Sequence, residues 1–262
     1  MNKPIANNMM ENDLVPLQTG AGGTLFGELL SGNRWVQVLE IGAVFLPPLL
    51  LVIAFHVIGG DSPLLFMGGL WGANILMIGL VWLGIRLRGD SWSSIGLSLV
   101  PASIPGLGWA VLKSIPVFAF AVGAFIVASI IMVNIVGIPE GINTSNLGFL
   151  QGNLPLLMVS LVGVYIVSSF GEEVVYRGFL ITRLEKIFAG RGKLTLIAAL
   201  TVSSLVFGFA HYAWGAMGIA QTSFMGAALG ISFIFLKRRL WPLILCHGYM
   251  DTALLVQLYL AP

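Results

Sequence analysis

The sequence is poor in charge and in cysteine. Only 9% of its 262 residues are charged and the mean hydropathy is +0.95, whereas roughly a quarter of a soluble globular domain is charged. An ordinary soluble domain is therefore excluded. The single cysteine, Cys246, excludes a disulfide framework. A net charge of +2 is too small to indicate a nucleic-acid partner. The polar start of the chain lacks the basic and apolar regions of a cleavable signal peptide.

Long apolar segments dominate the rest of the chain. Runs of about 20 apolar residues are typical of transmembrane helices, and several follow one another here. We expect an all-α polytopic membrane bundle of about seven helices, near residues 37–58, 64–85, 111–136, 154–177, 195–212, 216–236 and 241–260. Residues 1–34 are expected to form a polar cytoplasmic leader, and residues 35–262 a single transmembrane domain.

Basic residues lie in every second predicted loop. Arg34 precedes the first helix, and further lysines and arginines follow the second, fourth and sixth helices. The intervening loops and the C-terminus carry none. This positive-inside pattern predicts a cytoplasmic N-terminus in an integral, multi-pass membrane protein. We expect the membrane to be a bacterial cytoplasmic membrane. The Trp- and Ser-rich segment 87–113 is expected to lie at the cytoplasmic interface, and the charged segment 177–188 to project into the cytoplasm.

Few ionisable residues remain inside the predicted helices. Such residues are costly within a bilayer and often mark a functional site. They are Glu40, His56, Glu172, Glu173, His211, His247 and Asp251. Glu40 and His56 lie near helix ends, where a side chain can reach the membrane surface. We interpret these two as interfacial residues without a catalytic role.

The remaining residues can converge in one place. The fourth and fifth helices form an antiparallel hairpin about the basic turn at Arg191, and Glu172 and His211 lie almost equally far from that turn. The constant helical rise places both at similar depth. On the last helix, His247 and Asp251 are one turn apart and share a face. We predict a polar cavity that opens to the cytoplasm.

The stretch EEVVYR, residues 172–177, indicates different roles for two adjacent glutamates. Glu173 and Arg177 have the spacing and order of a helical ion pair, which is a structural role. Glu172 is turned about 100° away and has no partner in its own helix. An unpaired carboxylate in a desolvated site suits a general base. The alternative is that both glutamates are helix-end residues solvated by lipid headgroups.

Three motifs occur in order, EEVVYR (172–177), FGFAH (207–211) and HGYMD (247–251). They resemble the EExxxR, FxxxH and HxxxN/D motifs of the CPBP family, over about residues 150–260. That family contains the type II CAAX prenyl endopeptidases and the bacterial Abi proteins linked to bacteriocin immunity. The resemblance implies a glutamate-dependent intramembrane endopeptidase with a peptide or membrane-protein substrate.

The resemblance also implies a role for each matching residue. Glu172 with His211 would activate a water molecule, while His247 and the last motif residue would stabilise the oxyanion. The last residue is Asp251 here, where the eukaryotic prenyl proteases have asparagine. A carboxylate is a poor oxyanion donor unless it is protonated. Asp251 could instead orient His247 or bind a substrate amine.

Other hypotheses stay open at this point. We expect no cofactor, but Glu172, Glu173, His211 and His247 are of ligand types that bind zinc, although no HExxH motif occurs. Cys246 could be a thiol nucleophile, but its place beside His247 favours a small apolar filler. A non-proteolytic immunity protein or partner-binding membrane protein could use the same cavity. A transporter is disfavoured because no repeated half is present.

Overall fold

Helices form the regular structure of the chain. A computed structural model describes residues 23–59, 62–97, 104–137, 148, 150–188 and 192–261, and no strand occurs in these ranges. Seven helical segments are long and apolar enough to span a membrane: Arg34–Ile58, Met67–Leu87, Pro105–Val136, Leu154–Ile187, Lys193–Ala210, Tyr212–Phe235 and Trp241–Leu260. The predicted all-α polytopic fold is confirmed. Most of the predicted leader and the turn at Arg191 lie outside the described residues.

Regular elements follow one another closely along the chain. In order they are α1 (Leu25–Gly32), α2 (Arg34–Gly59), α3 (Pro63–Leu87), η1 (Trp92–Ile95), α4 (Ile104–Val136), α5 (Leu154–Gly163), η3 (Val164–Ser169), α6 (Phe170–Glu172), η4 (Glu173–Ile181), α7 (Thr182–Ile187), α8 (Lys193–Ala210), η5 (Tyr212–Trp214), α9 (Gly215–Phe235) and α10 (Trp241–Leu260). Of the η elements, η1 and η5 are 3-10 helices, whereas η3 and η4 are π-helices.

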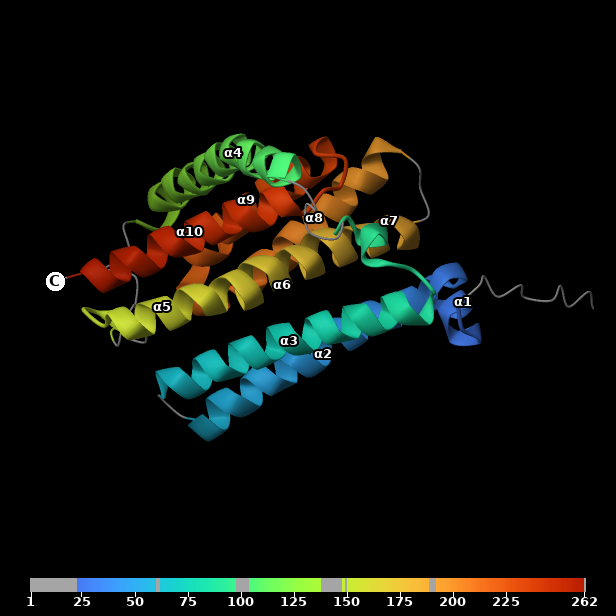
Figure 1. Cartoon of the computed structure of the whole chain (residues 1–262), viewed down its shortest axis with the longest axis horizontal. Helices are drawn as coiled ribbons and strands as arrows, with labels where there is room; N and C mark the ends of the chain where they lie inside the picture. The colour runs from blue at the N-terminus through green and yellow to red at the C-terminus, as the bar shows by residue number, and fades with distance from the viewer. Residues whose placement is uncertain are drawn as a thin grey trace, which may run out of the picture.

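The fourth span runs through the middle of the bundle. Figure 1 shows α5 and α6 between the paired helices α2 and α3 on one side and α4 and α10 on the other. Contacts agree with this view, since α10 packs on α4, α5 and η3, and α3 packs on α6. Helix α8 packs on α9 and on η4. The fourth span therefore touches both halves of the bundle.

This fourth span is one continuous helix from Leu154 to Ile187. Its middle is π-helical, and the amide of Phe170 donates to the carbonyl of Tyr165, an i→i+5 bond. Every residue of η4 is buried, and the two arginines of this part of the chain, Arg177 and Arg183, have carboxylate partners inside the protein. The expected projection of segment 177–188 into the cytoplasm stays a prediction.

The connection before the third span is shorter than expected. Helix α4 begins at Ile104, so Lys113 lies within a helix and not in a loop. Pro105 in the first turn is compatible with this early start, because the amides there have no helical partner. The part of the connection that includes η1 packs inward, since Ile95 is buried and the carbonyl of Gly96 accepts the amide of Leu240 at 3.2 Å.

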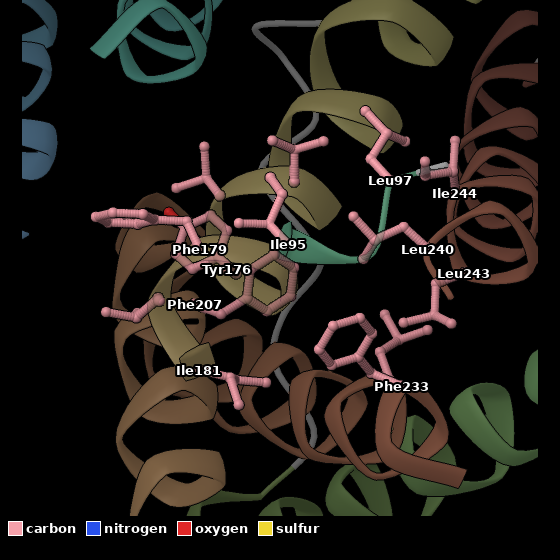
Figure 2. Packing of buried hydrophobic residues seen from close by; sticks show 14 of the residues in the cluster. Ile95, Leu97, Tyr176, Phe179, Ile181, Phe207, Phe233, Leu240, Leu243 and Ile244 are labelled. Atoms are coloured by element: carbon pink, nitrogen blue, oxygen red, sulfur yellow. The ribbon is translucent and has the colours of Figure 1, made fainter. Parts of the chain in front are cut away.

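A single large core surrounds η4. It contains Tyr176, Phe179, Phe207, Phe233 and Leu240, and Figure 2 shows these side chains converging from the fourth span, α8, α9 and the start of α10. All of them are at most 4% exposed. Burial of each such side chain contributes about 1.5–3 kcal/mol in water. The site-bearing span is therefore fixed by packing on several neighbours.

Glu40 is not the surface-reaching residue that the sequence predicts. It is 8% exposed, and its carboxylate lies 2.6 Å from Nη1 of Arg88 and 3.3 Å from Nε of Arg183. Arg88, the C-cap residue of α3, and Arg183 of α7 thus balance the charge where the first, second and fourth spans meet. His56, by contrast, is exposed near the end of α2.

Candidate active site

Three parts of the chain bring the predicted site residues together. The α6–η4 segment holds Glu172, Glu173 and Arg177, and α10 holds His247 and Asp251. The sixth predicted residue, His211, follows the last residue of α8 as its C-cap. These elements are far apart in sequence and adjacent in the bundle, because η4 packs on α8 and η3 packs on α10.

Glu173 is the centre of the hydrogen-bonded part of the site. Its Oε1 accepts from Nη1 of Arg177 at 2.8 Å and from Nδ1 of His247 at 2.9 Å. The Glu173 side chain is fully enclosed and Arg177 is 1% exposed. An ionised carboxylate only accepts, so His247 must donate from Nδ1 in this pair. The contact fixes the ring and points its other nitrogen, Nε2, away from Glu173.

The Nε2 of His247 faces two further carboxylates. It lies 3.8 Å from Oε2 of Glu172 and 3.8 Å from Oδ1 of Asp251, both beyond hydrogen-bond distance. Oε1 of Glu172 accepts from Ser168 at 3.3 Å, and Oδ2 of Asp251 accepts from Ser169 at 3.0 Å. Oε2 of Glu172 is buried and accepts no hydrogen bond from the protein.

Exposure divides these residues into two groups. The side chains of Glu172 and Asp251 are 14% and 20% exposed. Those of Glu173 and His247 are 0% and 4% exposed. A small molecule that approaches the site therefore meets Glu172 and Asp251 before it meets Glu173. Access and hydrogen bonding thus distinguish the two adjacent glutamates.

His211 joins the site through an aromatic ring. Its Nδ1 lies 2.8 Å from the carbonyl oxygen of Phe207, one turn earlier, so Nδ1 donates and a neutral ring keeps Nε2 as an acceptor. The ring of Phe207 lies 4.8 Å from that of His211 and 6.1 Å from that of His247. Within the described ranges, His211 and Glu172 form neither a hydrogen bond nor an ion pair.

Phe207 also supports the enclosed ion pair. Its ring centre is 4.3 Å from the guanidinium carbon of Arg177, and its ring packs edge-on against Tyr176 at 5.0 Å. A guanidinium over an aromatic face gains electrostatic attraction. The first residue of the FGFAH motif therefore connects the histidine of that motif to Arg177 in the first motif.

Sequence analysis missed the two serines that hold the exposed carboxylates. Ser168 stands four residues before Glu172, a spacing that could have indicated the contact. Ser169 and Asp251 are 82 residues apart, and no local pattern relates them. Phe207 was visible as a motif residue, but its contacts with the rings and with Arg177 arise only from packing.

Among the residues that the structure describes, no group of three or more His, Cys, Asp or Glu side chains is arranged to hold a metal ion. Glu173 and His247 satisfy each other, and Nδ1 of His211 is engaged by a carbonyl. Cys246 is fully buried, as expected of an apolar filler.

The comparisons with known proteins concern the C-terminal part of the chain. Residues 154–253 match a family model described as Rce1-like, type II CAAX prenyl endopeptidase Rce1-like. No curated protein and no solved structure matches the chain. The matched region begins at the start of the fourth span and includes all three motifs. The resemblance predicted from those motifs is confirmed, because residues 154–253 are similar to the Rce1-like family of type II CAAX prenyl endopeptidases, a family of proteases.

Proposed function

We propose that this protein is an intramembrane endopeptidase that cleaves a peptide or membrane-protein substrate with a water molecule activated by Glu172 and His211. The family match supports peptide hydrolysis as the reaction class. The main observation for Glu172 is its oxygen Oε2, which is buried and accepts no hydrogen bond from the protein, in a side chain that keeps 14% exposure. A general base needs such an available lone pair near the reacting water.

The proposed reaction begins with a water molecule between Glu172 and His211. Glu172 takes one proton of the water, and Nε2 of neutral His211 accepts a hydrogen bond from the other. The water oxygen bonds to the carbonyl carbon of the substrate and gives a tetrahedral oxyanion. Collapse breaks the C–N bond, and the proton held by Glu172 passes to the leaving amine. Atoms and charge balance without a further reactant.

His247 is assigned to the oxyanion. A protonated His247 would donate from Nδ1 to Glu173, a bond 2.9 Å long, and from Nε2 to the developing negative charge. Glu173 and Arg177 are positioning residues in this scheme, because both are enclosed and act through His247. Asp251, held by Ser169, lies beside Nε2 and would orient the imidazole or bind a substrate amine.

The test compares two glutamate-to-glutamine variants of the purified protein in detergent. Glu172→Gln should lower turnover of a peptide or co-expressed membrane substrate by about 10²–10⁴-fold, the usual contribution of a general base. Glu40→Gln is the matched control, because Glu40 is a buried carboxylate paired with Arg88 and Arg183 outside the site. It should leave turnover per folded molecule unchanged.

Further measurements separate the competing hypotheses. Near-normal turnover by Glu172→Gln would remove Glu172 as the base. Turnover that is lost to a chelator and restored by zinc would support a metal enzyme instead. If the Glu172→Gln variant keeps the biological effect of the wild-type protein, the result would support a non-proteolytic immunity or partner-binding protein. A comparison of membrane proteomes with wild-type and Glu172→Gln protein would show which substrates accumulate.

A further inference from the structure

A second polar site lies away from the candidate active site, where α9 connects to α10. A cavity of about 310 Å³ is lined there by Ser93, Gly96, Lys237, Arg238 and Arg239. Its volume is at the lower end of ligand pockets, which measure about 300–1,000 Å³. Two walls come from distant parts of the chain, the η1 segment and the α9–α10 turn. The backbone bond between Gly96 and Leu240 holds these walls together.

Positive charge in this pocket exceeds the negative charge near it. Arg238 is paired with Glu185, whose carboxylate lies 2.8 Å away. Arg239 lies over the ring of Trp109, 4.8 Å from its centre, which orients the guanidinium without neutralising it. Over the described ranges, neither Lys237 nor Arg239 forms an ion pair with a carboxylate. Two exposed cations therefore remain available to an anion. The Ser93 hydroxyl is hydrogen-bonded to that of Ser91 at 2.6 Å, and it can donate to an anion when Ser91 is the donor in that pair.

The backbone holds two of these cations in a conformation that usually requires glycine. Lys237 and Arg238 have φ angles of 54° and 60°, and no other described non-glycine residue has a positive φ. The amide of Lys237 donates to Ile234 and that of Arg238 to Phe233, which together form a Schellman motif at the end of α9. Glycine is the common residue at the first of these positions. The chain instead has a strained lysine whose side chain lines the pocket.

The pocket lies at the boundary of the membrane. The sixth candidate span ends at Phe235 and the seventh begins at Trp241, so the basic turn lies just beyond the ends of two helices. Trp109 and Trp92 lie beside it, and tryptophan is enriched at the headgroup level of bilayers. Basic pockets between membrane helices bind anionic lipid headgroups. A ligand for this basic pocket should therefore carry a phosphate group.

We propose that the pocket lined by Ser93 and Lys237–Arg239 binds the phosphate of an anionic phospholipid headgroup. Lys237 and Arg239 supply the charge, and Ser93 donates a hydrogen bond. Arg238 is fixed by Glu185 and shapes the wall. This site is independent of the proposed peptidase reaction, because none of its residues contacts Glu172, His211 or His247.

Lipid binding by the full-length protein tests this proposal. The protein is reconstituted into phosphatidylcholine vesicles with or without phosphatidylglycerol, and retained lipid is measured by native mass spectrometry alongside thermal unfolding. At about 1 kcal/mol per cation near a lipid surface, removal of two charges lowers affinity about 30-fold. The Lys237→Gln/Arg239→Gln double variant should therefore show that loss. Lys193→Gln is the matched control, because Lys193 is an exposed lysine at the same end of the bundle.

A glycine substitution separates binding from folding. Lys237→Gly suits the positive φ of this position, so the variant should unfold at the same temperature as wild type or higher. Its affinity for phosphatidylglycerol should fall about fivefold, the effect of one charge. Equal affinity in wild type and the double variant would overturn the proposal. An equal loss in Lys193→Gln would overturn it too, since it would show general surface attraction. Equal stabilisation by inorganic phosphate would overturn the lipid assignment.

Discussion

Two clusters of buried charge occur in the part of the bundle that the structure describes, and they differ in balance. In the first, Glu40 lies beside Arg88 and Arg183, and Asp90 lies 3.5 Å from Arg88, so two arginines meet two carboxylates. The second, in the candidate active site, has three carboxylates around His247, and only one of them is paired with an arginine. Both clusters consist of ionisable residues inside apolar helices. A cluster with balanced charge and a cluster with an excess of carboxylates demand different explanations.

Access distinguishes the clusters further. The side chains of Glu40, Arg88 and Arg183 are 6%, 1% and 2% exposed. In the active-site cluster, Glu172 and Asp251 are more open and are held only by serine hydroxyls. An ionisable residue within a membrane helix is a functional hypothesis by default. A functional role for such a residue is better supported when its charge is incompletely paired and its side chain is accessible, as with Glu172 and Asp251.

The largest effect on stability is expected from Arg177→Ala. This change leaves Glu173 as a buried carboxylate with His247 as its remaining partner, and loss of one member of a buried pair typically costs about 3–5 kcal/mol. Thermal or denaturant unfolding in detergent measures it. Arg238→Ala is the control, because its pair with Glu185 is partly exposed and should contribute at most about 1 kcal/mol. Equal losses in both variants would contradict this view of the site.

A smaller loss of stability is expected from Glu40→Gln. The amide oxygen can still accept one hydrogen bond, but Arg88 and Arg183 then lie buried with only the partly exposed Asp90, 3.5 Å from Arg88, as a counter-charge. Hydrogen bonds to charged groups contribute about 1.5–3 kcal/mol, which is the expected loss. The same unfolding measurement applies, with Asp90→Asn as control, since the Asp90 side chain is 38% exposed. If Glu40→Gln abolished turnover without unfolding, the two clusters would not differ in function.

Hydropathy predicted the fold well where apolar residues face lipid or core. The last helix has the predicted range, 241–260, and the number of spans agrees. The prediction for Glu40 failed because its partners are far away in sequence. Glu40 was expected to reach the membrane surface, but Arg88 and Arg183 pair with it inside the protein. The π-helical stretches of the fourth span have no simple periodic signal, so a regular helix was assumed.

The candidate site was predictable where its contacts lie within one helix, and not where they join distant parts of the chain. The Glu173–Arg177 contact follows from spacing along one helix. The contact between Glu173 and His247 joins residues 74 positions apart, and it depends on the packing of α10 against the fourth span. The sequence predicted His211 and Glu172 at a similar depth in the membrane, but a similar depth does not define the direction in which each side chain points. The ring of His211 packs against Phe207 and Trp214 instead of touching Glu172.

The smallest effect is expected from Asp251→Asn. Asparagine keeps an oxygen that accepts from Ser169, a bond of 3.0 Å, and adds an amide donor beside Nε2 of His247. Turnover should stay within about tenfold of wild type, whereas Asp251→Ala, which loses both features, should fall further. Turnover in detergent, with unfolding temperature as the check on folding, distinguishes the two. If the folded asparagine variant were as inactive as the alanine variant, the negative charge of Asp251 would itself be required. Its role would then be electrostatic or acid–base, and donation to the oxyanion would be excluded. The site would in that case need all three carboxylates around His247, which would make its contrast with the charge-balanced Glu40 cluster sharper.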